Sequence, residues 1–265
     1  MKSIHPAAWI GLLLNFFLSW VLFSALLGMD ATALEGDERA LVEALIEAAT
    51  AIKPLYYSML AAQAVALGCI VSGLAFGLPL AVISGFLMLP ASLVYLIGCA
   101  LSHYRIKFAM FSAAPPGNQG AHFVFTSAAL KKTRMLAIIL LVSAAACLLL
   151  SLGAGYNMLD VVLAFLGMSM AGAYCMARAQ KNPALSLYDS HLTLNPALFA
   201  PRLFLPYADI HQATLLDNGS IRFEIDSAKT RHILTWSLNA VAPEERRAAL
   251  QELAAALTAN GVALY

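Results

Sequence analysis

Histidines are the residues of this chain best suited to moving protons or binding a metal, but their spacing supports neither role. The six histidines are spread over the whole sequence: His5, His103, His122, His191, His211 and His232. None forms an H-x-x-x-H or His–Cys pattern, which would bring two ligands together on a helix or in a loop. Because an enzyme must hold its nucleophile, base or metal together, the sequence favours a non-enzymatic protein without cofactor or metal.

Three polar side chains fall within long apolar stretches, where a polar group is costly. Asn15 and Gln63 lie deep in such stretches, and Asp160 lies near the start of another. The two amides are expected to hydrogen-bond between helices, and Asp160 is expected to sit in interfacial water at the positive end of its helix. If these residues instead conduct a solute or ion, the protein is a small transporter or an accessory subunit of one.

The composition indicates an integral membrane protein. Of the 265 residues, 61% are apolar and only 12% are charged, and the mean hydropathy is +0.76. A soluble domain of this size could not bury so much hydrocarbon. The lipid bilayer is therefore one expected partner. The net charge of +1, without the clustered cations that neutralise a phosphate backbone, argues against nucleic acid.

Five apolar stretches are long enough to cross a hydrocarbon core of about 30 Å as helices. They are residues 6–29, 56–77, 79–101, 135–153 and 159–177. Very short breaks separate the second from the third and the fourth from the fifth, so each pair is predicted to be a tight hairpin. Residues 37–53 predict an acidic amphipathic helix, and Pro90 predicts a kink in the third span.

Lysine and arginine in the short loops indicate the orientation, because cytoplasmic loops carry an excess of both. The loop after the third span is basic, and so is the segment after the fifth: Arg105, Lys107, Lys131, Lys132, Arg134, Arg178 and Lys181. With five crossings, a multi-pass protein of the inner (plasma) membrane follows, with its N terminus outside and its C-terminal domain cytoplasmic. The acidic helix then lies beside the anionic inner leaflet, which would repel it.

Gly73 and Gly77 match the small-xxx-small pattern, which lets helix backbones approach closely. The pattern predicts packing within the bundle. Contact between the subunits of a homo-oligomer is the alternative.

The composition changes after Lys181, so we predict a transmembrane domain of residues 1–181 and a soluble α+β domain of residues 182–265. About six short strands alternate apolar and polar residues, and Asn218-Gly219 supplies the positive φ angles of a tight hairpin turn. A helix is expected from Pro243, with Leu253 and Leu257 on its apolar face.

Residues 205–210 (LPYADI), the Asn218-Gly219 hairpin and the terminal helix together resemble the bacterial pleckstrin-homology-like (PH-like) domains. The resemblance extends from residue 183 to the end and implies a small antiparallel sheet or partial barrel closed by one helix. The expected strands are one fewer than the seven usual in that family. The five-span portion matches no family on its residues.

The resemblance also implies a binding module. Candidate contacts with a protein partner or a lipid headgroup are the basic residues expected near one rim: Arg202, Lys229, Arg231 and His232. From residue 183 onward the chain has six Lys and Arg against eight Asp and Glu, so a protein partner is favoured over a phosphorylated headgroup, which needs converging cations. The leading hypothesis is a non-enzymatic membrane-anchored scaffold that recruits an unidentified protein partner.

Overall fold

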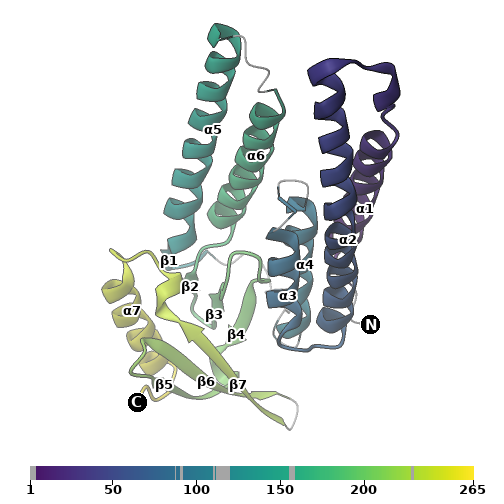
Figure 1. The fold of residues 1–265 in the computed structure, drawn as a ribbon. Helices are drawn as coiled ribbons and strands as arrows, with labels where there is room; N and C mark the ends of the chain where they lie inside the picture. Colours follow the sequence, from purple (N-terminus) through teal and green to yellow (C-terminus); the bar gives the residue numbers. More distant parts are fainter. Residues whose placement is uncertain are drawn as a thin grey trace. The chain divides into compact units, whose positions relative to one another are not determined.

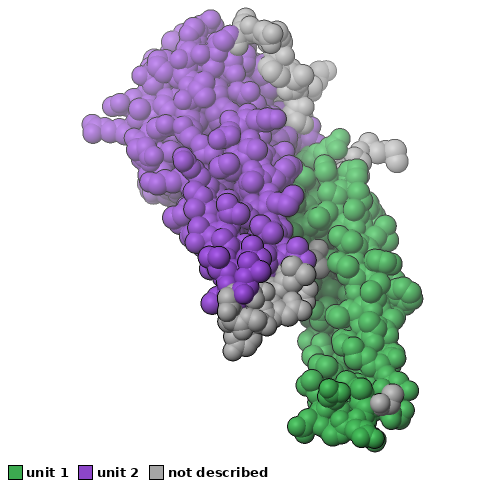
Figure 2. Space-filling view, turned by 90° about the horizontal axis from the view of Figure 1, so that it is seen from above, with its two compact units in different colours: residues 1–107 green, residues 108–265 purple. Residues whose placement is uncertain are grey.

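The structure, a computed structural model, describes residues 4–86, 88–89, 92–109, 111, 120–154, 159–227 and 230–265. It is mostly helical, with a small region of antiparallel sheet toward the C terminus. The chain divides into two compact units, residues 1–107 and 108–265, which are coloured separately in Figure 2. The second unit thus contains two apolar helices as well as the sheets, whereas the composition placed a boundary after residue 181.

Four helices in the described residues are long and apolar enough to cross a membrane. They are α1 (Pro6–Leu27), α2 (Gly36–Val71), α5 (Ala128–Ala154) and α6 (Leu159–Lys181). The stretch expected as a third span instead contains two shorter helices, α3 (Gly77–Phe86) and α4 (Leu93–Lys107). At a rise of 1.5 Å per residue they are about 15 and 22 Å long, shorter than a hydrocarbon core of about 30 Å. Pro90 lies outside the described residues.

Helices α3 and α4 run in opposite directions, so the pair starts and finishes at the same end of the first unit. Gly77 begins α3 so close to α2 that a Cβ there would be 2.8 Å from the amide nitrogen of Ile70. Near the end of α4, the Ser102 hydroxyl accepts a hydrogen bond from the amide of His5, at 2.9 Å. Ala8 and Ile70 belong to one buried cluster, which places both contacts at one end. Figure 1 shows α3 and α4 side by side.

The acidic helix and the second span expected from the sequence form one continuous helix, α2, of 36 residues. Pro54 lies inside it without ending it, as prolines in membrane helices often do where neighbouring groups satisfy the freed backbone. The acidic residues lie in the N-terminal half, where Arg39 pairs with Glu43 at 2.8 Å. This half therefore prolongs the span along its own axis instead of forming a separate helix on the membrane surface.

The second unit contains two antiparallel sheets and a C-terminal helix (Figure 1). The first sheet has the order β1 (Phe123–Phe125), β2 (Leu185–Leu187), β3 (His191–Leu194) and β4 (Leu203–Pro206). The second has the order β5 (Ile210–Leu215), β6 (Ser220–Ser227) and β7 (Thr230–Ser237), and α7 (Arg246–Ala259) follows. The turn expected at Asn218-Gly219 joins β5 to β6, and Gly219 has a φ of 72°.

Strand β1 precedes the membrane helices α5 and α6, yet it pairs with β2, which follows them. Phe125 is opposite Leu185 in this register, and Phe123 is opposite Leu187. The α5–α6 hairpin is thus inserted between two neighbouring strands of one sheet. Buried side chains of both sheets and α7 form the core, including Leu185, Phe223, Trp236, Leu253 and Leu257.

Candidate functional site

The sheets are joined to the membrane hairpin by hydrogen bonds at the base of α5. Glu245, just before α7, accepts a hydrogen bond from the amide of Thr126 at 2.6 Å and another from its hydroxyl at 3.0 Å. The amide of Ala242 donates to the carbonyl of Thr126 at 2.9 Å, and Ser127 forms an antiparallel bridge with Val241. These bonds fix the chain on either side of the hairpin, so surfaces of the sheets have a defined position relative to α5.

Strand β7 is an edge strand of eight residues. The amide of Leu238 donates to the carbonyl of Gly219 at 3.1 Å, one step beyond the Ser220–Ser237 pair. Hydrogen-bonded pairs alternate along an antiparallel ladder, so the backbone groups of every second residue face away from β6: Arg231, Ile233 and Thr235. Ile233 is 54% exposed. Among the described residues no strand pairs with this side of β7, which we call the docking edge.

The outer edges of β5 and β4 have backbone partners. Along β5, the amide of Ala213 donates to the carbonyl of Ala263 at 3.1 Å, and the amide of Leu215 donates to that of Tyr265 at 2.7 Å. On β4, the amide of Phe204 donates to the carbonyl of Phe111 at 3.2 Å. Edge strands are usually protected in this way because they can pair with other chains. The docking edge is therefore the long strand edge left available in the described part of the second unit.

The basic residues predicted as contacts occupy different surroundings. Arg231 lies on the docking edge, 3.3 Å from Glu224 and 3.5 Å from Asp226, and the ring of His232 meets that of Phe111 edge-on at 6.2 Å. Lys229 lies outside the described residues.

Arg202 belongs to the first sheet and has other partners. Its guanidinium donates to the hydroxyls of Thr193 at 3.0 Å, Tyr188 at 2.9 Å and Ser186 at 3.2 Å. Arg202 and Arg231 therefore bond to different residues.

The two amides predicted to join helices do so in the first unit. The Asn15 side-chain nitrogen donates to Gln63 Oε1 at 3.0 Å, and both residues are fully buried. Gln63 Nε2 lies 3.4 Å from the carbonyl of Ser84 and 3.2 Å from the sulfur of Met88, while Tyr95 donates to the Gln63 carbonyl. Within the described residues, Asn15 Oδ1 has no hydrogen-bond partner. The side chain of Asp160 lies outside the described residues.

The two glycines of the small-xxx-small pattern are not on one helix. Gly73 lies in the turn after α2 with a φ of 75° and open space around its Cβ position, whereas Gly77 permits the close approach of α3 to α2. Closer approaches occur between α1 and α4, where a Cβ on Gly98 would be 2.1 Å from the nitrogen of Ala8 and one on Gly11 would be 2.2 Å from that of Tyr95. Because the two residues of each pair are far apart in the sequence, no local sequence pattern predicted these contacts.

Two titratable side chains in and beside the first sheet, His191 and Tyr207, are buried. The ring of His191 stacks on Tyr188 at 4.2 Å and meets Phe204 at 4.5 Å. Burial, and then the charge of Arg202, lower the pKa of His191. Burial, and then the charge of Asp189, raise the pKa of Tyr207 to about 12. A neutral histidine and a protonated tyrosine suit a packed core, and the described residues contain no cluster that could hold a metal.

No protein family, curated protein or solved structure that we compared matches this chain. The functional argument therefore depends on the chain's own geometry.

Proposed function

We propose that the protein is a non-enzymatic, membrane-anchored scaffold whose second unit recruits a protein partner through the docking edge. The observation that carries the proposal is the long edge of β7, with exposed Ile233, in a unit bonded to a membrane hairpin. An added strand from a partner would gain main-chain hydrogen bonds along β7 and side-chain contacts at alternate positions. The inserted hairpin would keep that surface at a fixed height above the bilayer.

We further propose that the sheets and α7 form a PH-like module. Support comes from the strand order, four strands in one antiparallel sheet and three in the next, followed by one helix. The expected six strands become seven because β1 comes from before the membrane hairpin. The LPYADI segment lies at the step between the two sheets, where residues 207–209 form a short 3-10 turn between β4 and β5.

For orientation we propose four crossings in the inner membrane, with α3–α4 as a re-entrant hairpin. The sheet unit and the N terminus are then both cytoplasmic, which replaces the outside N terminus inferred from five crossings. The basic residues at the ends of α4, α5 and α6 all remain inside, in agreement with the positive-inside tendency. The acidic half of α2 moves outside, away from the anionic inner leaflet that would repel it.

Photo-crosslinking along β7 tests the docking role. A crosslinking amino acid at Thr235 should form specific adducts in intact membranes. Ile233→Pro removes an amide that faces outward while leaving the ladder to β6 intact, so the adducts should disappear although the melting temperature changes little. Ile233→Thr keeps the amide and the β-branched shape, and it should preserve the adducts. Adducts that persist in the proline variant, or equal adducts from the partly exposed Glu252 on α7, would contradict recruitment at this edge.

A small transporter or transporter subunit is the second candidate, and one observation favours it. Re-entrant segments occur at membrane depth where they are buried in protein or line a polar path. The buried Asn15 Oδ1 beside this hairpin has no hydrogen-bond partner among the residues that the structure describes. Asn15→Leu should then abolish solute flux into vesicles containing the protein. Unchanged flux in that variant would remove this candidate.

A further inference from the structure

A pocket of about 670 Å³ lies at the base of α5, apart from the docking edge. One wall is the segment from Thr126 to the second turn of α5, and the other is the connection from β7 into the start of α7. We call this the basal pocket. Both walls belong to the second unit, and the bonds between Thr126 and Glu245 hold them together. Its shape is therefore present before any ligand arrives.

The basal pocket is lined by more positive than negative side chains. Four cations face two carboxylates around it: Lys131, Lys132, Arg134 and Arg246 against Glu244 and Glu245. Glu245 already accepts two hydrogen bonds from Thr126. Within the described part of the chain, none of the four cations takes part in an ion pair. The pocket thus has an excess of about two positive charges available for an anion.

One of these cations is held in place by the backbone. Arg246 Nε donates to the carbonyl of Val241 at 3.2 Å, and its Nη2 lies 3.5 Å from the carbonyl of Asn239. Arg246 is also the first residue of α7, a helix of 14 residues, whose unpaired N-terminal amides and dipole favour an anion at this end. A fixed guanidinium and a helix start therefore lie beside the flexible lysines of α5.

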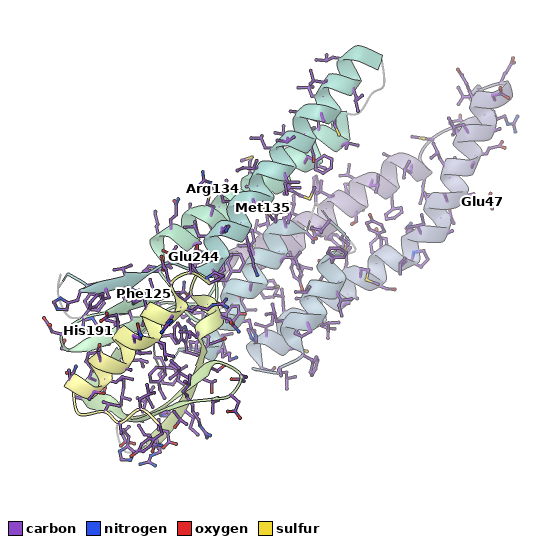
Figure 3. The ribbon with its side chains drawn as sticks, turned by 90° about the vertical axis from the view of Figure 1, so that its left-hand side faces the viewer. Glu47, Phe125, Arg134, Met135, His191 and Glu244 are labelled. Carbon is purple, nitrogen blue, oxygen red and sulfur yellow. The ribbon has the colours of Figure 1, made fainter. Side chains whose placement is uncertain are left out.

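The pocket lies at the level where α5 changes from charged to apolar. Figure 3 labels Arg134 and Met135 at this step, with Glu244 between them and Phe125. From Met135 the outward side chains are apolar and more than half exposed, as in Leu136 and Ile138. Such a surface faces acyl chains in a membrane, and the charged turn before it lies at the depth of the lipid phosphates.

We propose that the basal pocket binds the phosphate-bearing headgroup of an anionic glycerophospholipid. The phosphate would contact Lys131, Arg134 and Arg246, and the acyl chains would follow the apolar face of α5. This site goes beyond the docking role, because it concerns which lipid surrounds the scaffold and is independent of any protein bound at β7. Of the basic residues predicted as headgroup contacts, the described ones, Arg202, Arg231 and His232, do not line this pocket.

Lipid retention by the full-length protein in nanodiscs tests the proposal. Native mass spectrometry would measure how much phosphatidylglycerol and how much phosphatidylcholine each protein retains. The proteins compared are the wild type, the pocket variant Lys131→Gln/Arg134→Gln and the control variant Lys181→Gln/Arg247→Gln. The control pair removes the same charge from the same unit outside the pocket. We expect the wild type to retain phosphatidylglycerol in preference to phosphatidylcholine. In the pocket variant the ratio of the two retained lipids should fall about tenfold, and in the control variant it should not change.

Two outcomes would overturn the lipid site. Equal retention by wild type and pocket variant would exclude the pocket, and an equal loss in the control would reduce the effect to general surface charge. Inorganic phosphate at millimolar concentration forms a separate arm. If it displaces the retained lipid, the site binds free phosphate and the lipid assignment fails. If the double variant does not fold, the single variant Arg134→Gln, with thermal unfolding as a check of its fold, provides the same comparison.

Discussion

The side-chain amide of Asn15 on α1 donates a hydrogen bond to Gln63 on α2 at the depth where α3 gives way to α4. Gln63 also approaches the carbonyl of Ser84, near the end of α3, and its own carbonyl accepts from Tyr95 in the first turn of α4. One glutamine therefore links α1 and α2 to both α3 and α4.

We predict that Asn15 and Gln63 are energetically coupled. In a double-mutant cycle with Asn15→Ala and Gln63→Ala, the coupling free energy should be about 0.6 kcal/mol, the average for interhelical hydrogen bonds in a membrane protein. Unfolding in mixed micelles of mild detergent and dodecyl sulfate measures it. Strictly additive effects of the two substitutions would show that the bond does not join the helices in solution.

Gly98→Ala should destabilise the first unit by about 1–3 kcal/mol, the usual cost of overpacking a filled core. The new methyl group would be 2.1 Å from the backbone nitrogen of Ala8, and a backbone atom cannot move aside as a flexible side chain can. Gly68→Ala is the matched control, because its Cβ position has no neighbour within 4 Å. The same micelle assay should show no loss for the control, and a loss of equal size in both variants would contradict the close α1–α4 packing.

Glu245→Gln should loosen the connection between the sheets and α5. The carboxylate accepts two hydrogen bonds from Thr126, and bonds to a charged group contribute about 1.5–3 kcal/mol each. We expect faster hydrogen exchange in peptides covering β1 and the start of α7. Glu244→Gln removes the same charge from the neighbouring exposed residue and should leave exchange unchanged. Identical exchange in the two variants would argue against the connection.

The stability of the first sheet should decrease as the pH falls below about 6.5. Burial and Arg202 lower the pKa of His191 in the folded state, so the unfolded chain binds a proton at a pH where the folded chain does not. The stabilisation is complete above the ordinary histidine pKa of 6.5 and is lost as the pH falls from that value. His191→Phe keeps the ring stacking and should weaken this pH dependence, measured as hydrogen exchange of β3 and β4. An unaltered dependence would assign it to another group.

Local signals predicted much of the second unit. Asn218-Gly219 defines its hairpin through backbone conformation alone, and the leucines of the terminal helix recur at helical spacing. Strand β1 escaped prediction because Phe123 to Phe125 are only three residues, and their partner strand lies some 60 positions later, beyond the membrane hairpin. Pairing between segments so far apart depends on the fold of the whole sheet, and a short stretch of sequence carries no information about it.

In the first unit, hydropathy located the apolar segments and the buried amides but not the path of the third segment. A re-entrant pair buries as many apolar residues as a crossing helix, so both produce the same hydropathy profile. The sequence features that could have indicated two short helices were small residues close to the interruption between α3 and α4. Gly85 leaves room for Leu96 of the opposite helix, and Ser92 donates its hydroxyl to the carbonyl of Gly85. Small residues of this kind are common in membrane helices.

We propose that the N terminus and the sheets lie on one membrane face, and a cysteine-accessibility map tests this placement most directly. Single cysteines at Ser3, Glu43 and Asn218, in a variant with its four native cysteines replaced, would be probed with an impermeant thiol reagent. From outside, four crossings predict labelling at Glu43→Cys alone, and from the cytoplasmic side, labelling at Ser3→Cys and Asn218→Cys. Labelling of Ser3→Cys from outside, with Asn218→Cys reached only from inside, would contradict the re-entrant hairpin and restore five crossings.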